Sequence, residues 1–181
     1  MRTGRALAVS AALTVCSAAA PAFAATSGNT TATFSVTGGA LAITVPPSTV
    51  NLGSGTPGTQ ITAQLGPVQV TDARAQLTTA WTSSVTATNF TTGGGTGPET
   101  IANSSASYWS GPATATTGIG TFTPGQTNTA AAVTLATSRT AFTLAGGVGD
   151  NSATWNPTLI ISVPAAAVAG TYTGTVTHSV A

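Results

Sequence analysis

Apolar and polar residues alternate with a period of two in short runs along most of the chain. A period of two is that of a β-strand with one buried face. The clearest apolar positions are Phe34 and Val36; Leu41, Ile43 and Val45; Ile61, Ala63 and Leu65; Val68 and Val70; Val133 and Leu135; Phe142 and Leu144. Each run therefore predicts a short strand with its apolar residues on one face.

Stretches rich in Gly, Pro, Asn and Ser separate these runs and are typical of turns. No window of helical length keeps an apolar period of 3.6 residues, and PAAAVAG at 164–170 predicts only a short bend. Many short strands separated by turns favour an antiparallel sheet architecture. We therefore expect an all-β protein, a single antiparallel β-sandwich domain in residues 25–181 with strands from Thr31 to Val180.

Residues 1–24 have the pattern of a secretory signal peptide. Arg2 and Arg5 precede the apolar run ALAVSAALTV, and AFA at 22–24 fits a signal-peptidase site. The run is too short for a stable transmembrane helix, so no membrane span is expected. Cys16 allows a lipoprotein anchor as an alternative, but Val15 is not the small residue that such a motif needs. Cleavage after Ala24 would leave a mature chain without cysteine and therefore without disulfides.

The predicted mature chain carries very few charges. Arg74 and Arg139 oppose three acids, Asp72, Glu99 and Asp150, so the net charge is 2 − 3 = −1, and the chain has no lysine. Binding to nucleic acid needs several cations that neutralise phosphates, so this class is excluded. The same shortage argues against electrostatic docking to anionic lipids.

His178 is the only histidine, and it invites a catalytic or metal-binding interpretation. Counting by twos places it on the same strand face as Tyr172, Val176 and Val180. A catalytic base needs a nucleophile and an orienting carboxylate, and a metal needs further ligands. The sequence indicates neither, so a structural wall position is favoured, and no enzyme, metal or cofactor is expected.

The acidic residues also favour structural roles. Asp72 and Arg74 lie two positions apart in VTDARA, so they point the same way from a strand and can form an ion pair. Asp150 lies in GDNS, which is turn chemistry. Glycoside hydrolysis would need two carboxylates across one cleft, and nothing in the spacing indicates such a pair.

Aromatic rings are the remaining candidates for ligand contact. A nearly uncharged domain can hold a sugar by stacking its apolar faces on aromatic side chains. Trp81 and Trp155 are interpreted first as core residues, with Trp155 and Tyr172 structural. Tyr108 and Trp109 are adjacent, so they point to opposite faces of a strand. Trp81, Tyr108, Trp109 and His178 form the candidate ligand-binding set.

Two longer stretches resemble the WxL domain family. VTDARAQLTTAWTSSVTATNFT at 70–91 and ATWNPTLIISVPAAAVAGTYTGTVTHSVA at 153–181 are similar to its two motif segments, and FSVTGGALAITVP fits its opening strands. The first motif reads Trp81-Thr82-Ser83, without the Leu, and the second reads His178-Ser179-Val180, without the Trp. The resemblance implies a secreted or surface-attached module of Gram-positive bacteria that binds peptidoglycan non-covalently, without catalysis.

Two functions follow as expectations. The first is a secreted or cell-surface module that binds the cell wall. The alternative is a structural subunit that assembles with itself or with other surface proteins through exposed sheet edges. Peptidoglycan or surface proteins are thus the expected partners.

Overall fold

The computed structural model describes residues 27–46 and 49–181, and the predicted signal peptide lies outside these residues. The chain divides into a first unit that ends at Ser35 and a second, Val36–Ala181. Residues 27–35, the described part of the first unit, form no strand and are exposed. No helix of the described residues is long and apolar enough to cross a membrane.

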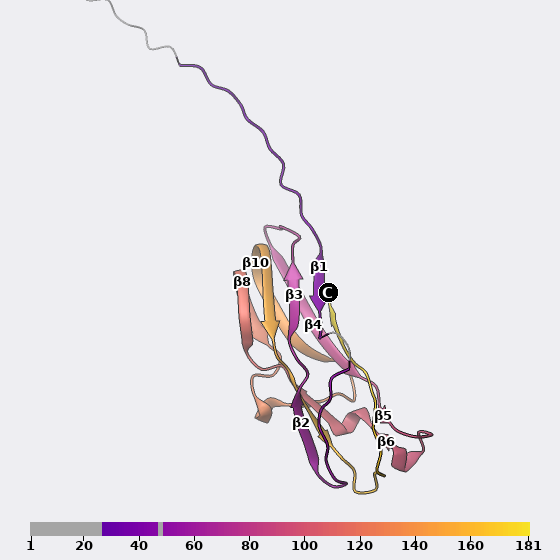
Figure 1. The fold of residues 1–181 in the computed structure, drawn as a ribbon. Coiled ribbons are helices and arrows are strands. Elements are labelled where there is room, and N and C mark those ends of the chain that lie inside the picture. Colours follow the sequence, from indigo (N-terminus) through magenta and orange to yellow (C-terminus); the bar gives the residue numbers. More distant parts are fainter. Residues whose placement is uncertain (1–26, 47–48) are drawn as a thin grey trace, which may run out of the picture. The chain divides into compact units, whose positions relative to one another are not determined.

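The second unit is built from antiparallel strands, which confirms the expected all-β, sandwich-like fold (Figure 1). Three single-turn 3-10 helices interrupt the strands in the described residues. The elements are β1 Leu41–Thr44, β2 Gln60–Gln64, β3 Val68–Asp72, β4 Thr79–Ala87, β5 Phe90–Thr91, η1 Gly97–Glu99, β6 Thr100–Ile101, η2 Asn103–Ser105, β7 Ala106–Trp109, β8 Ala113–Pro124, η3 Thr129–Ala131, β9 Val133–Thr134, β10 Arg139–Trp155, β11 Thr158–Ser162 and β12 Val176–Val180.

The larger sheet has the order β1-β3-β10-β4-β12, and β8 pairs with the other side of β10. The second sheet has the order β2-β11-β7-β9, and β5 pairs with β6 in a short ribbon. β2 leads into β3, and β10 leads into β11, through only a few residues. Each sheet therefore continues directly into the other at two places.

The long strand β10 pairs with β3 and β4 in separate halves. Asn151–Trp155 pair with β3, and Arg139–Gly147 pair with β4. Figure 1 shows β3 pointing up to the connecting loop and β4 leading away from it. Because both pairings are antiparallel, β10 must bend between its halves, and β8 bends with it.

Glycines allow this bend. The β8–β10 register shifts between Ala145 and Val148 and again before Ser152. Gly146 and Gly149 on β10, with Gly118 and Gly120 on β8, all have positive φ angles. Only glycine adopts this backbone region at little cost, so the ladder turns where the glycines are.

A buried carboxylate closes the loop between β3 and β4. Asp72 is 1% exposed and accepts hydrogen bonds from Nε and Nη2 of Arg74, both at 2.8 Å. The Thr79 hydroxyl donates to the same carboxylate, and Arg74 also donates to the carbonyl of Ala80 at 3.0 Å. Asp72 and Arg74 thus form a structural ion pair that joins the end of β3 to the start of β4.

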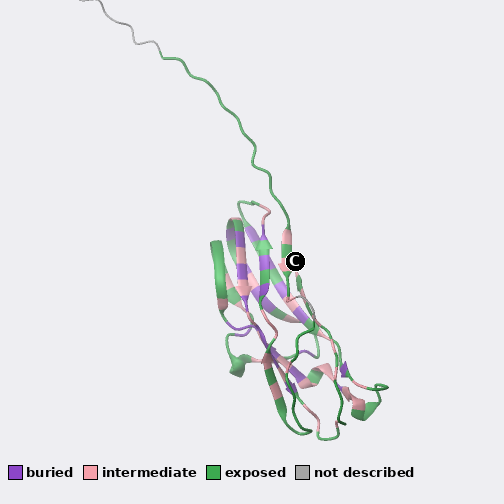
Figure 2. Ribbon diagram, in the orientation of Figure 1, coloured by how far each residue is buried: buried purple, intermediate pink, exposed green. Residues whose placement is uncertain are grey.

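The core lies between the facing strands (Figure 2). Phe142 stacks on Trp155 with ring centroids 4.9 Å apart, and Trp81 contacts Phe142 and Phe122. Trp81 Nε1 donates to Asn151 Oδ1 at 2.9 Å, and Asn151 Nδ2 lies 3.4 Å from Asp72 Oδ2. The aromatic core and the buried ion pair are therefore parts of one connected network.

The first strand begins later in the chain than the sequence predicted. The strand expected at Thr31–Thr37 is absent, and Phe34 and Val36 are 90% and 79% exposed. The first strand begins only at Leu41. Alternation alone predicted a strand here, but a strand also needs a partner, and this segment has none among the described residues.

The ion pair gives a first testable prediction. Asp72→Asn removes the charge that Arg74 pairs with, and we expect a loss of about 2–4 kcal/mol in the free energy of unfolding at neutral pH. Hydrogen bonds from Arg74 hold the pKa of Asp72 well below its usual range. Its stabilisation is thus present above the unfolded-state pKa of about 3.9 and is lost as the pH falls below that value.

Urea unfolding of both proteins at neutral and acidic pH measures this effect. Asp150→Asn is the matched control, because Asp150 is exposed, and it should change stability by less than about 0.5 kcal/mol. Equal stabilities of Asp72→Asn and Asp150→Asn would contradict the role given to the buried pair.

Candidate functional site

An apolar groove opens on one side of the domain. Its volume is about 1060 Å³, slightly above the range of about 300–1,000 Å³ for small-molecule sites. Two connections form its walls: residues 49–57, between β1 and β2, and residues 167–175, between β11 and β12. Ile61 of β2 and Ile161 of β11 contribute to its apolar lining.

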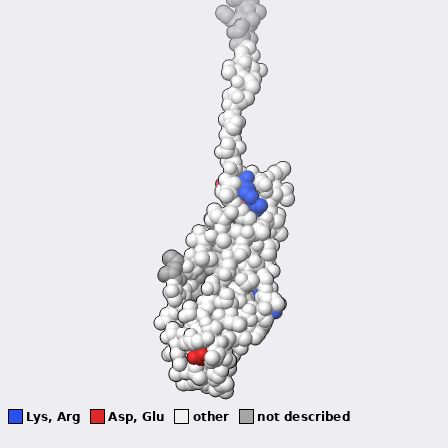
Figure 3. Space-filling view, turned by 90° about the vertical axis from the view of Figure 1, so that its right-hand side faces the viewer, with Lys and Arg blue, Asp and Glu red and all other residues white. Residues whose placement is uncertain are grey.

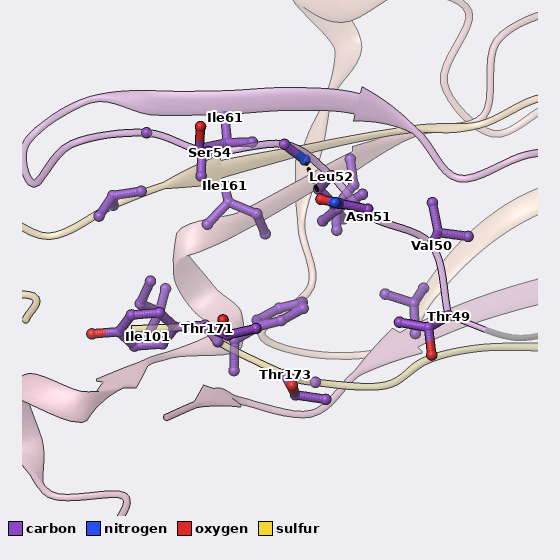
Figure 4. A pocket seen from close by; sticks show the side chains of 18 of the residues that line it. Thr49, Val50, Asn51, Leu52, Ser54, Ile61, Ile101, Ile161, Thr171 and Thr173 are labelled. Atoms are coloured by element: carbon purple, nitrogen blue, oxygen red, sulfur yellow. Dashed lines mark hydrogen bonds between the residues drawn. The ribbon is translucent and has the colours of Figure 1, made fainter. Parts of the chain in front are cut away.

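The two connections face each other across the groove (Figure 4). Thr49, Val50 and Leu52 lie on one side, and Thr171 and Thr173 lie on the other. The Asn51 side chain accepts a hydrogen bond from Gly53 N at 2.8 Å and so shapes its own turn. Gly174 lies against Phe90, where a Cβ would come within 2.6 Å of the ring, so a larger residue would push this wall outward.

The second wall is anchored by Tyr172. Its hydroxyl lies 2.9 Å from the carbonyls of both Pro98 and Val168. Thr173 also forms a β-bridge with Thr91, in the short β5–β6 ribbon. Tyr172 lines the groove, and these contacts hold its hydroxyl.

His178 reaches the groove from β12, and behind it lies a buried relay of hydrogen bonds. Trp155 Nε1 donates to the Tyr108 hydroxyl at 3.2 Å, and this hydroxyl lies 3.1 Å from His178 Nε2. The Tyr108 hydroxyl accepts a hydrogen bond from Trp155, so it can donate its own proton to Nε2 of His178. This requires Nε2 to carry no proton. A neutral His178 with its proton on Nδ1 fits this arrangement.

The electrostatics of the relay agree with a neutral histidine. Burial lowers the pKa of His178 to about 4. Burial also raises the pKa of Tyr108 above its usual range, so the hydroxyl keeps its proton and remains a donor. No charged side chain of the described residues lines the groove.

The structure brings only part of the candidate ligand-binding set together. Tyr108 and His178 are in contact, with ring centroids 5.6 Å apart, but Tyr108 is fully buried. Trp81 is 2% exposed and belongs to the network around Asn151. Neither Trp81 nor Tyr108 offers a ring face to solvent, because both fill the space between the strands.

Trp109 lies on the opposite face of β7 from Tyr108 and is half-buried. Its Nε1 atom is buried and has no hydrogen-bond partner among the described residues. It does not line the groove. Of the four candidate ligand-binding residues, His178 alone lies in the groove, while Trp155, expected to be structural, is in the core.

The sequence did not reveal the groove walls. VNLGSGTPG at 50–58 was interpreted as a turn because it is rich in Gly, Thr and Pro. Tyr172 was expected on the last strand with His178, but that strand begins only at Val176, so Tyr172 lies in the connection that forms the second wall. Within residues 27–46 and 49–181, no group of three or more His, Cys, Asp or Glu residues is placed to hold a metal ion.

The described residues form an all-β domain with an uncharged, largely apolar groove that is lined in part by His178. Comparison with known proteins finds no matching family model, no matching curated protein and no matching solved structure.

The single histidine gives a second prediction. The NMR signals of the His178 ring protons are easily assigned, because no other histidine is present. Their chemical shifts, followed against pH, should give a midpoint near the pKa of about 4. In the unfolded chain the His178 ring is protonated below its pKa of about 6.5, whereas in the folded protein it stays neutral until the pH approaches 4. The free energy of unfolding therefore falls as the pH drops towards 4. Between pH 7 and pH 5 we expect a loss of about 2 kcal/mol.

His178→Gln should remove this dependence while keeping a polar side chain at the site. Urea unfolding of both proteins at pH 7 and pH 5 provides the comparison. An NMR midpoint close to 6.5 in the native protein would show that the ring is hydrated and that the relay does not hold it neutral.

Proposed function

We propose that the protein is a secreted or surface-associated, non-catalytic module that binds the cell wall, and that the apolar groove is its contact surface. The observation that carries the proposal is a large groove without charged side chains on a domain that is itself almost uncharged. The visible face in Figure 3 is nearly free of Lys, Arg, Asp and Glu. Recognition on such a surface must use apolar contact and hydrogen bonds.

Peptidoglycan offers groups that suit this surface. Its acetyl, lactyl and alanine methyl groups are small and apolar, and its amides donate and accept hydrogen bonds. Thr49, Thr171 and Thr173 place hydroxyls among the apolar side chains of the groove. Ligand sites combine a mostly apolar lining with a few polar groups that fix orientation. The resemblance to WxL domains supports the same class of partner.

The position of His178 supports binding better than catalysis. A general base acts best when its pKa lies near the working pH, whereas burial lowers the pKa of His178 to about 4. No carboxylate of the described residues lines the groove to orient the ring or to act beside it. Its relay with Tyr108 and Trp155 instead fixes the inner end of the groove.

Sedimentation with purified cell walls tests the proposal. Val50 and Val168 line opposite walls and are 37% and 43% exposed, so a charge at either position can be hydrated without unfolding the protein. Val50→Asp and Val168→Asp should each weaken wall binding at least about tenfold, because a carboxylate loses hydration when ligand covers it. Leu77→Asp is the control, since Leu77 is 84% exposed and lies outside the groove.

The salt dependence of binding provides an independent prediction. Screening weakens interactions between exposed charges, and the Debye length shrinks from about 10 Å at 0.1 M salt to about 3 Å at 1 M. The groove has no charge to screen, so the bound fraction should stay constant over this range. Release of the protein at high salt, or equal losses in all three Asp variants, would count against the groove as the contact surface.

A further inference from the structure

Among the described residues, a segment with strand-like alternation has no β-sheet partner, and the long strand β8 has one free side. The segment is the N-terminal arm, residues 27–38, in which Ala32, Phe34 and Val36 alternate with Thr and Ser. The edge is the free side of β8, Ala113–Pro124, which pairs only with β10 among the described residues. We propose that the arm of one copy adds as a strand to the β8 edge of a second copy.

The arm has the composition of an edge-binding strand. Residues 31–37 read TATFSVT and are rich in β-branched and aromatic residues, with no charge, Gly or Pro. Phe34 is 90% exposed and Val36 is 79% exposed, although large apolar side chains gain free energy when they are removed from water. The arm thus has both an apolar face to bury and backbone groups to pair.

The β8 edge lacks two of the usual protections against such pairing, charged residues and internal prolines. Exposed edges normally carry charged residues, internal prolines or a cover that prevents association. β8 reads ATATTGIGTFTP, with no charged residue and its only proline at the last position. Residues 114–121 are exposed, and Ile119 is 65% exposed. The positive φ angles at Gly118 and Gly120 divide β8 into residues 113–117 and residues 121–124, and an incoming strand can pair with either segment.

The arrangement of the sheet favours pairing between copies. The arm leads into β1, at one edge of the sheet, and β8 forms a different edge, with β3 and β10 between them. Donor and acceptor are therefore different surfaces, which makes the contact heterologous. A heterologous contact that does not close into a ring extends into a linear chain of copies. The inference does not depend on the proposed wall binding, which uses the groove.

Sedimentation-velocity and light-scattering measurements of the chain without its predicted signal peptide test the inference. The average mass should rise with protein concentration to about twofold the monomer mass or more, without a fixed upper limit. Phe34→Ser/Val36→Ser should remain monomeric, because it removes the apolar face of the arm. Both residues are exposed, so the variant should keep the melting temperature of the native chain.

The acceptor edge is tested separately. Thr116→Lys/Thr121→Lys adds two charges to β8, where both residues are exposed, and should also give a monomer. Thr71→Lys is the matched control, because Thr71 is exposed on β3, which has a neighbouring strand on each side. Mixing the arm variant with the β8 variant should restore dimers, since one supplies an intact edge and the other an intact arm.

Engineered cysteines identify the contact directly. Cys16 lies in the predicted signal peptide and is the only cysteine, so Thr33→Cys and Thr121→Cys each introduce a single thiol. The inference predicts a disulfide-linked heterodimer when the two variants are mixed and oxidised, and none from Thr33→Cys with Thr71→Cys. A native chain that stays monomeric at all concentrations, or oligomers that persist in both the arm and β8 variants, would overturn it. Wall binding is measured on the same variants, so the two proposals can fail independently.

Discussion

The buried carboxylate of Asp72 is the constraint on which the arrangement of the sheets depends. It lies at the point where β3 ends and the chain turns into β4, and it receives the Arg74 guanidinium, the Thr79 hydroxyl and the Asn151 amide. Asn151 also receives the indole of Trp81. One network thus fixes the turn, the bend of β10 and the position of a core tryptophan. A buried charge is tolerated only when it is paired and hydrogen-bonded, and this one is.

The bend has consequences for the rest of the domain. Because β10 pairs with β3 through one half and β4 through the other, the larger sheet folds over on itself. The connections from β1 to β2 and from β11 to β12 then pass on one side of the domain, where they form the groove. The aromatic relay from Trp155 through Tyr108 to His178 joins this groove to the core.

Much of the fold could be predicted from local pattern, and the groove could not. The alternation at Leu41 and Ile43, at Val68 and Val70, and at Phe142 and Leu144 matches strands β1, β3 and β10. The spacing of Asp72 and Arg74 indicated their ion pair. Phe34 and Val36 show the same alternation without a strand, because pairing depends on a partner distant in sequence. Tyr108 and His178 meet across 70 residues, a contact that no local pattern contains.

We propose that an uncharged groove between the connections at residues 49–57 and 167–175 contacts the cell wall. The most direct test is a titration of the isotope-labelled protein with soluble peptidoglycan fragments, followed by amide and histidine NMR signals. We expect the NMR signals of these two connections and of His178 to shift, and those of the β8 amides to stay unchanged. Shifts confined to residues outside the groove, or no shifts at fragment concentrations that compete with whole walls, would contradict it.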